Sequence, residues 1–185
     1  MSIPMSIVPM SIVPMILVAS TVSAPAPITP ALAVSISIPS DGSEQRLEYR
    51  RPDDHFHVIV SNRSDIVQNV WQEWCSWGHA NLSFEFENAA GKTWTAKKRP
   101  GLWTRNFPSA WAIAPGDQLV LDVHWGDEAA WEGFPPFGTE RETFRVRAVF
   151  EIAEDGDTSL YKVWTGRVVS DTRDVLLSKW RLDAK

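Results

Sequence analysis

The chain has 185 residues, enough for one domain with a hydrophobic core and too few for two domains of ordinary size. Ten tryptophans and an aromatic content of 11% exclude a wholly disordered chain, and the net charge of −5 argues against nucleic acid as a partner, because phosphate binding requires a basic face. The single cysteine, Cys75, excludes an intrachain disulfide framework and a cysteine-rich zinc site.

Residues 1–40 differ from the rest of the chain because they contain no charged residue, and the expected leader comprises residues 1–32. They open with proline-containing repeats that each begin with methionine, so the possible starts are Met1, Met5, Met10 and Met15. The prolines interrupt every apolar run of about 20 residues, so no transmembrane segment is expected. The stretch MILVASTVSA resembles the apolar region of a secretory signal with cleavage after Ala24 or Ala26, although no basic residue precedes it. We therefore expect a signal-like or disordered leader and an exported protein, periplasmic or extracellular.

Residues 33–185 are expected to form a single β-sandwich domain, because apolar and polar residues alternate with a period of two in most of its segments. In chain order, the side chains expected to face the core are Val34, Ile36 and Ile38; Phe56, Val58 and Val60; Leu82, Phe84 and Phe86; Leu119, Leu121, Val123 and Trp125; and Phe144, Val146, Ala148, Phe150 and Ile152. Residues 155–157 are expected to form a turn before another strand in 161–170. The segment 172–182 fits either a short helix or an edge strand.

About eight or nine short strands, with a turn roughly every ten residues, predict an all-β fold, a two-layer antiparallel sandwich. No alternation of strands and helices is present, which excludes a parallel α/β architecture. Two long irregular segments, 99–111 and 126–140, carry aromatic residues, and we expect them to fold back over the ends of the sandwich.

Four segments carry a resemblance to a known family: HVIVSN (57–62), LSFEFENAAGK (82–92), WAIAPGDQLVLDVHW (111–125) and FRVRAVFEI (144–152). Together they resemble bacterial immunoglobulin-like modules, and their order is similar to that in the bacterial intracellular proteinase inhibitor domain. The resemblance spans residues 55–152 and implies an immunoglobulin-like sandwich. It transfers no inhibitory residue, because no reactive-loop motif matches, and the segment WQEWCSWGH (71–79) departs from the pattern.

The histidines and the cysteine are the residues best suited to metal binding or catalysis. His55 and His57 share one strand face, and with Cys75 and a further histidine they match part of a copper site. However, no methionine follows the cysteine. The preferred interpretation is therefore that His55 and His57 are surface residues on either side of a buried Phe56. A cysteine crowded by tryptophans is expected to be desolvated rather than activated, and no nucleophile-elbow motif is present. The sequence therefore predicts no catalytic residue, no metal ligand, no cofactor and no enzyme activity.

The stretch around the cysteine contains three closely spaced tryptophans. A regular strand would place Glu73 among inward-facing tryptophans, so we expect a bulge or bend near Trp74. Cys75 and Trp77 are expected to be buried, Gly78 to turn the chain, and Trp74 to face outward.

Ten tryptophans exceed what one small core usually needs, and exposed indole rings on a β-sandwich can stack on sugar rings or clamp apolar groups. The candidate ligand-binding residues are Trp74, Trp103, Trp111 and Trp131. The sequence thus predicts an exported, non-catalytic module for binding or structural support at the cell envelope, with a protein partner or a glycan. The alternatives are a carbohydrate- or metal-binding module on the same fold and a proteinase inhibitor acting through a long loop.

Overall fold

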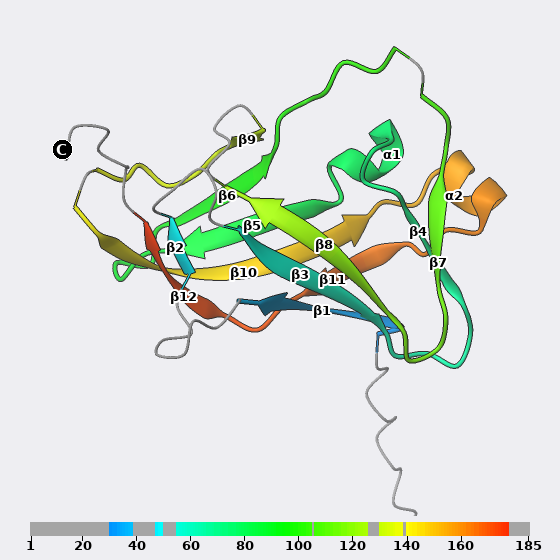
Figure 1. Ribbon diagram of the computed structural model, residues 1–185, viewed down its shortest axis with the longest axis horizontal. Helices are drawn as coiled ribbons and strands as arrows, with labels where there is room; N and C mark the ends of the chain where they lie inside the picture. Colours follow the sequence, from blue (N-terminus) through cyan, green and yellow to red (C-terminus); the bar gives the residue numbers. More distant parts are fainter. Residues whose placement is uncertain are drawn as a thin grey trace, which may run out of the picture.

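The computed structural model describes residues 30–38, 47–49, 55–104, 106–125, 130–138 and 140–177, with only the backbone of 47–49. These residues form a mostly β structure with antiparallel sheets and two short helices (Figure 1). The predicted leader with its cleavage sites lies almost wholly in residues 1–29, outside the described part. Leu32, the last residue assigned to the leader, begins the first strand and is buried.

The described strands belong to two larger sheets and one separate ribbon. The smaller sheet has the order β1-β3-β8, and its strands span Leu32–Ser37, His55–Asn62 and Gln118–His124. The larger sheet has the order β2-β12-β10-β5-β6-β9, spanning Leu47–Tyr49, Arg173–Leu177, Glu142–Ile152, Leu82–Glu87, Thr93–Lys98 and Trp131–Glu132, and β11 (Gly166–Val169) also pairs with β10. The ribbon joins β4 (Gln68–Trp71) to β7 (Ala110–Ile113), and the helices are α1 (Ser76–His79) and α2 (Gly156–Tyr161).

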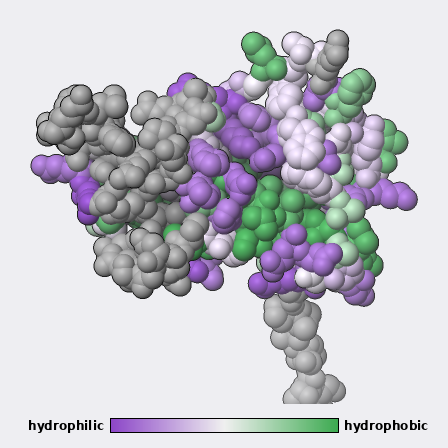
Figure 2. Space-filling view, viewed as in Figure 1, coloured by the Kyte–Doolittle hydropathy of each residue, from purple (hydrophilic) through white to green (hydrophobic). Residues whose placement is uncertain are grey.

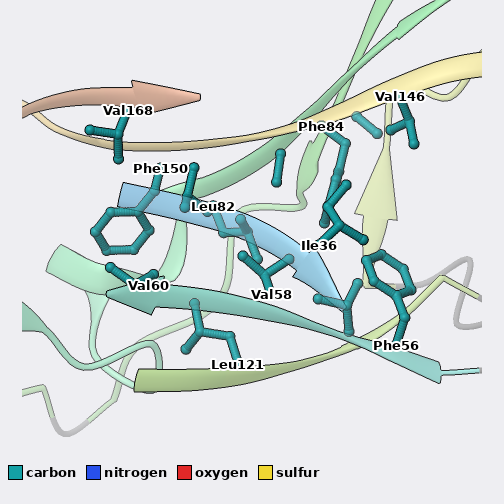
Figure 3. Close-up of a cluster of buried hydrophobic side chains, with 14 of the residues drawn as sticks. Ile36, Phe56, Val58, Val60, Leu82, Phe84, Leu121, Val146, Phe150 and Val168 are labelled. Atoms are coloured by element: carbon teal, nitrogen blue, oxygen red, sulfur yellow. The ribbon is translucent and has the colours of Figure 1, made fainter. Parts of the chain in front are cut away.

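Side chains from both larger sheets meet in one buried hydrophobic cluster. Those of β1, β3 and β8 point toward those of β5, β10 and β11, as the labelled residues in Figure 3 show. The alternating pattern predicted this cluster correctly, because all but two of the expected inward-facing residues are buried. The two exceptions, Ile38 and Leu119, are partly buried and pack against it. Burial of these apolar surfaces is the main force that holds the sheets together.

A buried asparagine fixes the corner where the smaller sheet leads into the ribbon. The side-chain nitrogen of Asn62 donates to the carbonyl oxygens of Ile66, at 2.7 Å, and Ile113, at 2.8 Å. Its side-chain oxygen accepts from the backbone N–H of Ser64 at 2.9 Å. Since buried backbone groups must be hydrogen-bonded, this one side chain satisfies groups on both sides of the corner. It thereby ties β7 to the end of β3.

Two expectations from the sequence are wrong at the C-terminal side of the chain. Residues 155–157 begin helix α2 rather than a turn, because the Asp155 carboxylate accepts from the Thr158 N–H and the Thr158 hydroxyl accepts from the Asp155 N–H. This reciprocal capping satisfies two N–H groups at the start of the helix. The described part of 172–182 is neither a helix nor an edge strand, since β12 lies between β2 and β10.

Candidate binding surface

The tryptophan-rich stretch changes direction twice within eight residues. Strand β4 ends at Trp71, and the N–H of Cys75 then donates to the Gln72 carbonyl at 3.2 Å before α1 begins at Ser76. The predicted bend near Trp74 is therefore confirmed. Gly78 permits it, because a Cβ atom at this position would lie 2.1 Å from the Gln72 oxygen. Only a glycine lets α1 pack this closely on the end of β4.

Cys75 is buried, as predicted, and its thiol donates to the Gln72 carbonyl oxygen at 3.1 Å. A buried thiol enclosed by backbone is shielded from substrates and oxidants. Trp77 is only partly buried, and its indole N–H donates to the Asp157 carboxylate at 2.7 Å. This bond connects α1 to the first turn of α2, so the stretch serves as a packed junction between elements.

Trp74 faces solvent, as the sequence predicted, with 61% of its surface exposed. Its ring lies 4.8 Å from the ring of Trp111, with an angle of 88° between the two planes. This edge-to-face arrangement is favourable for aromatic pairs and holds the outer ring in a defined orientation. Trp111 lies in strand β7 rather than in a loop, and it is partly buried against the core. The exposed Trp74 ring is thus held against the Trp111 ring, which strand β7 of the ribbon keeps in place.

Residues 99–104 and 106–109, which we call the arch, rise above α1 between β6 and β7 at the top of Figure 1. The Arg99 carbonyl lies 2.8 Å from the Nε2 atom of His79, and the His79 ring packs edge-on against Trp103 at 5.2 Å. At the other end, the Ser109 carbonyl accepts from the Gln72 N–H at 2.9 Å, and the Asn106 side chain bonds to Ser76. Both ends of the arch are therefore anchored on the turn and on α1.

The expectation that 99–111 folds back over the ends of the sandwich holds at Ala110 and Trp111, which pack against the core, but not at the tip of the arch. Leu102 is 99% exposed and Phe107 is 76% exposed, whereas Trp103 is 38% exposed. The second irregular segment behaves as expected where it is described, because Phe134 and Phe137 pack against the core. In Figure 2, the side chains at the top of the view, over the arch, are mostly pale or hydrophobic. We call the surface formed by Trp74 and Trp111 the aromatic end; Trp103 lies in the arch, against His79.

Trp131 lies elsewhere, and its predicted surface position is wrong. It belongs to the two-residue strand β9, is only 4% exposed, and packs against Phe84 with 5.4 Å between ring centres. Gly133 explains this placement, because a Cβ atom there would lie 2.2 Å from the Thr95 carbonyl oxygen. The segment therefore presses closely against β6 and carries Trp131 into the core. Its ring offers no face to a ligand.

The three histidines of the smaller sheet gather on its outer face. The ring centres of His55 and His57 are 5.7 Å apart, and those of His55 and His124 are 5.4 Å apart. The Nδ1 atom of His57 hydrogen-bonds to Asp122 at 2.7 Å. Among the described residues, no group of three or more histidine, cysteine, aspartate or glutamate side chains is arranged to hold a metal ion. Cys75 lies in a different place, in the turn before α1, so the copper-like combination does not come together.

A hollow of about 240 Å³ on the outer face of the larger sheet is the other candidate site. Its charged groups already neutralise one another, since Arg145 bonds to Glu87 and Arg147 bonds to Glu85, each at 2.6 Å. A ligand would have to replace these ion pairs. The aromatic end needs no such exchange, because the Trp74 ring already faces water. It is therefore the better candidate for a binding surface.

Comparisons of the chain with protein-family models, with curated proteins and with solved structures find no match. Neither of the two described helices has the length and hydrophobicity needed to span a membrane. The site must therefore be interpreted from its own chemistry. Sequence reasoning did not single out Leu102 and Phe107. They lie in a segment that has prolines at positions 100 and 108 and contains no acidic residue.

Proposed function

We propose that this chain is an exported, non-catalytic module with an immunoglobulin-like two-layer β-sandwich, which binds a protein partner through the aromatic end. The observation that carries the proposal is the exposed ring of Trp74, held edge-to-face on Trp111. Tryptophan is enriched among the few residues that dominate binding energy at protein interfaces. A ring already fixed in orientation loses little conformational entropy on binding.

The surroundings of Trp74 favour a protein partner over a glycan. A sugar ring that stacks on an indole also requires hydrogen bonds to its hydroxyl groups. The nearest side-chain amides are engaged within the chain, since Gln72 donates to the Ala110 carbonyl at 3.4 Å and Asn106 bonds to Ser76. The exposed surface itself is made of the Trp74 ring and its Trp111 neighbour. This composition is closer to the centre of a protein interface.

The remaining parts of the proposal have separate support. The charge-free leader with its MILVASTVSA stretch supports export to the periplasm or beyond. The hydrophobic cluster that both larger sheets share supports a sandwich. The burial of Cys75 supports a non-catalytic role, because the only thiol is withheld from substrates.

Site-specific photo-crosslinking tests the proposal. Benzoylphenylalanine replaces Trp74 in one variant and Val120 in the control, because Val120 is 53% exposed on the outward side of β8. Irradiation of intact cells should give a discrete adduct of higher mass from position 74 and none from position 120. Absence of an adduct at position 74, or the same adducts at both positions, would contradict the proposal. A fluorescence response to oligosaccharides that disappears in Trp74→Ala would replace the protein partner with a glycan.

A further inference from the structure

The arch presents apolar side chains that no described part of the chain covers. Leu102 and Phe107 have nearly all or most of their surface exposed, and Trp103, which follows Leu102 in the chain, is 38% exposed. Single exposed apolar residues are ordinary on protein surfaces. Three within six residues of one loop are not, because each forfeits the stabilisation that burial would give. The arrangement therefore indicates that another surface covers the arch.

The anchoring of the arch keeps this apolar tip directed outward. One end is held by the Arg99 N–H, which donates to the Ala130 carbonyl at 2.9 Å, and by the Arg99 carbonyl on His79. The other end is held by Asn106, whose side-chain oxygen accepts from the Ser76 N–H at 3.0 Å. A loop tied at both ends is preorganised for insertion and loses less entropy on docking than a free segment.

The charge around the arch identifies the chemistry of the covering surface. Residues 88–116 contain five of the 18 basic residues of the chain and none of its 23 acidic residues. Among the described residues, Glu132 lies 3.7 Å from Lys97 and Glu73 lies 3.1 Å from Lys98 at the base of the arch, so these two lysines are already paired. Arg99, at the start of the arch, is exposed. A chain with a net charge of −5 thus has an exposed arginine at the start of its apolar loop and no acidic residue within that loop, which matches an anionic surface.

We infer that the arch docks on an anionic lipid bilayer. Leu102 and Phe107 enter the boundary between headgroups and acyl chains, and Trp103 lies at the headgroup level, which is the usual position of tryptophan in membranes. Arg99, which is exposed at the start of the arch, faces the phosphates. Interfacial binding of this kind depends on buried apolar area together with attraction to anionic lipids, and the arch supplies both. The inference goes beyond the proposed protein-binding function, since it concerns the arch and a lipid surface.

Vesicle co-sedimentation of the full chain tests the inference. The chain should sediment with vesicles made of equal parts phosphatidylcholine and phosphatidylglycerol, less with phosphatidylcholine alone, and less as salt concentration rises. The double variant Leu102→Ala/Phe107→Ala should reduce the partition coefficient about tenfold or more, because it removes the inserting area. A wild-type chain that remains in the supernatant with the anionic vesicles would overturn the inference.

The matched control is Ile66→Ala/Val67→Ala. These residues are 63% and 53% exposed, and they lie at the opposite end of the β4–β7 ribbon from the arch. The control should bind vesicles like the wild type. All variants keep the same apolar leader, so binding through the leader would leave them equal. Equal binding of the arch variant and the wild type would therefore also overturn the inference, and it would assign the arch to a protein contact instead.

Discussion

The buried cluster between the two larger sheets and the aromatic end are both rich in aromatic rings, but different forces place those rings. In the cluster, strand parity directs Phe56, Phe84 and Trp125 inward, where they pack with ring centres 4.6–5.6 Å apart. At the aromatic end, backbone and side-chain hydrogen bonds hold the turn, α1 and the arch, and the Trp74 ring faces water. Tryptophan content alone therefore does not distinguish residues that stabilise the fold from residues that are available for binding.

The largest difference between the regions is expected from removing one ring in each. Phe84 is fully buried and contacts Phe56, Trp125 and Trp131. Phe84→Ala should lower the free energy of unfolding by about 3–5 kcal/mol, because it removes buried apolar surface and leaves a cavity. Phe107→Ala should change it by less than about 0.5 kcal/mol, since that ring is exposed. Urea denaturation of both variants measures this difference. Equal losses in the free energy of unfolding would contradict the distinction between the two regions.

A smaller effect is expected at the glycine that supports the aromatic end. Gly78→Ala should lower the free energy of unfolding by about 3 kcal/mol, because the new methyl group overlaps the Gln72 carbonyl and α1 must move. The shift should also change the near-ultraviolet circular dichroism of the Trp74–Trp111 pair. The control is Gly156→Ala, where no atom lies within 4 Å of the added carbon and stability should stay the same or rise slightly. A Gly78→Ala variant as stable as the wild type would contradict the close packing of α1.

The corner asparagine is expected to contribute next. Asn62→Ala removes one hydrogen bond from each of the Ile66 and Ile113 carbonyl groups and from the N–H of Ser64, while the Ser64 hydroxyl still donates to the Ile66 carbonyl at 3.1 Å. The free energy of unfolding should fall by about 1–3 kcal/mol. Amide hydrogen exchange should rise in β4 and β7 before it rises in β3, because the ribbon loses its tie to the sheet. Uniform exchange throughout would show that the ribbon is held in another way.

The smallest effect is expected on the polar outer face of the larger sheet. A double-mutant cycle of Arg145→Ala and Glu87→Ala should give a coupling energy of no more than about 1 kcal/mol, because both side chains are solvent-exposed. The coupling should weaken further in high salt. A coupling of several kcal/mol would mean that this charged face, and not only the cluster, holds the sheet together.

The strands were predictable from the sequence because a half-buried strand imposes a period of two on its residues. Phe144 to Ile152 in β10 follow that rule without exception at the expected inward positions. The same rule fails for Trp131, since β9 has only two residues and shows no period. The close approach that buries Trp131 depends on Gly133 and on the backbone of Thr95, which lies 38 residues earlier in the chain.

The candidate site was predictable only in part, for a related reason. The outward position of Trp74 followed from parity and from the impossibility of placing Glu73 among buried rings. The structure adds that Glu73 pairs with Lys98 at 3.1 Å. The exposure of Leu102 and Phe107 depends on how the arch is anchored, and the bond between Asn106 and Ser76 joins residues 30 positions apart. Such contacts leave no periodic signal in a single sequence.

The central claim is that the tryptophans divide into a group that stabilises the fold and a group at the surface that is available for binding. Parallel urea denaturation of Trp131→Ala and Trp74→Ala tests this division most directly. The free energy of unfolding should fall by about 3–5 kcal/mol for Trp131→Ala, because its ring is buried, and by less than about 1 kcal/mol for Trp74→Ala. Similar losses in the two variants would contradict the claim and make Trp74 part of the core.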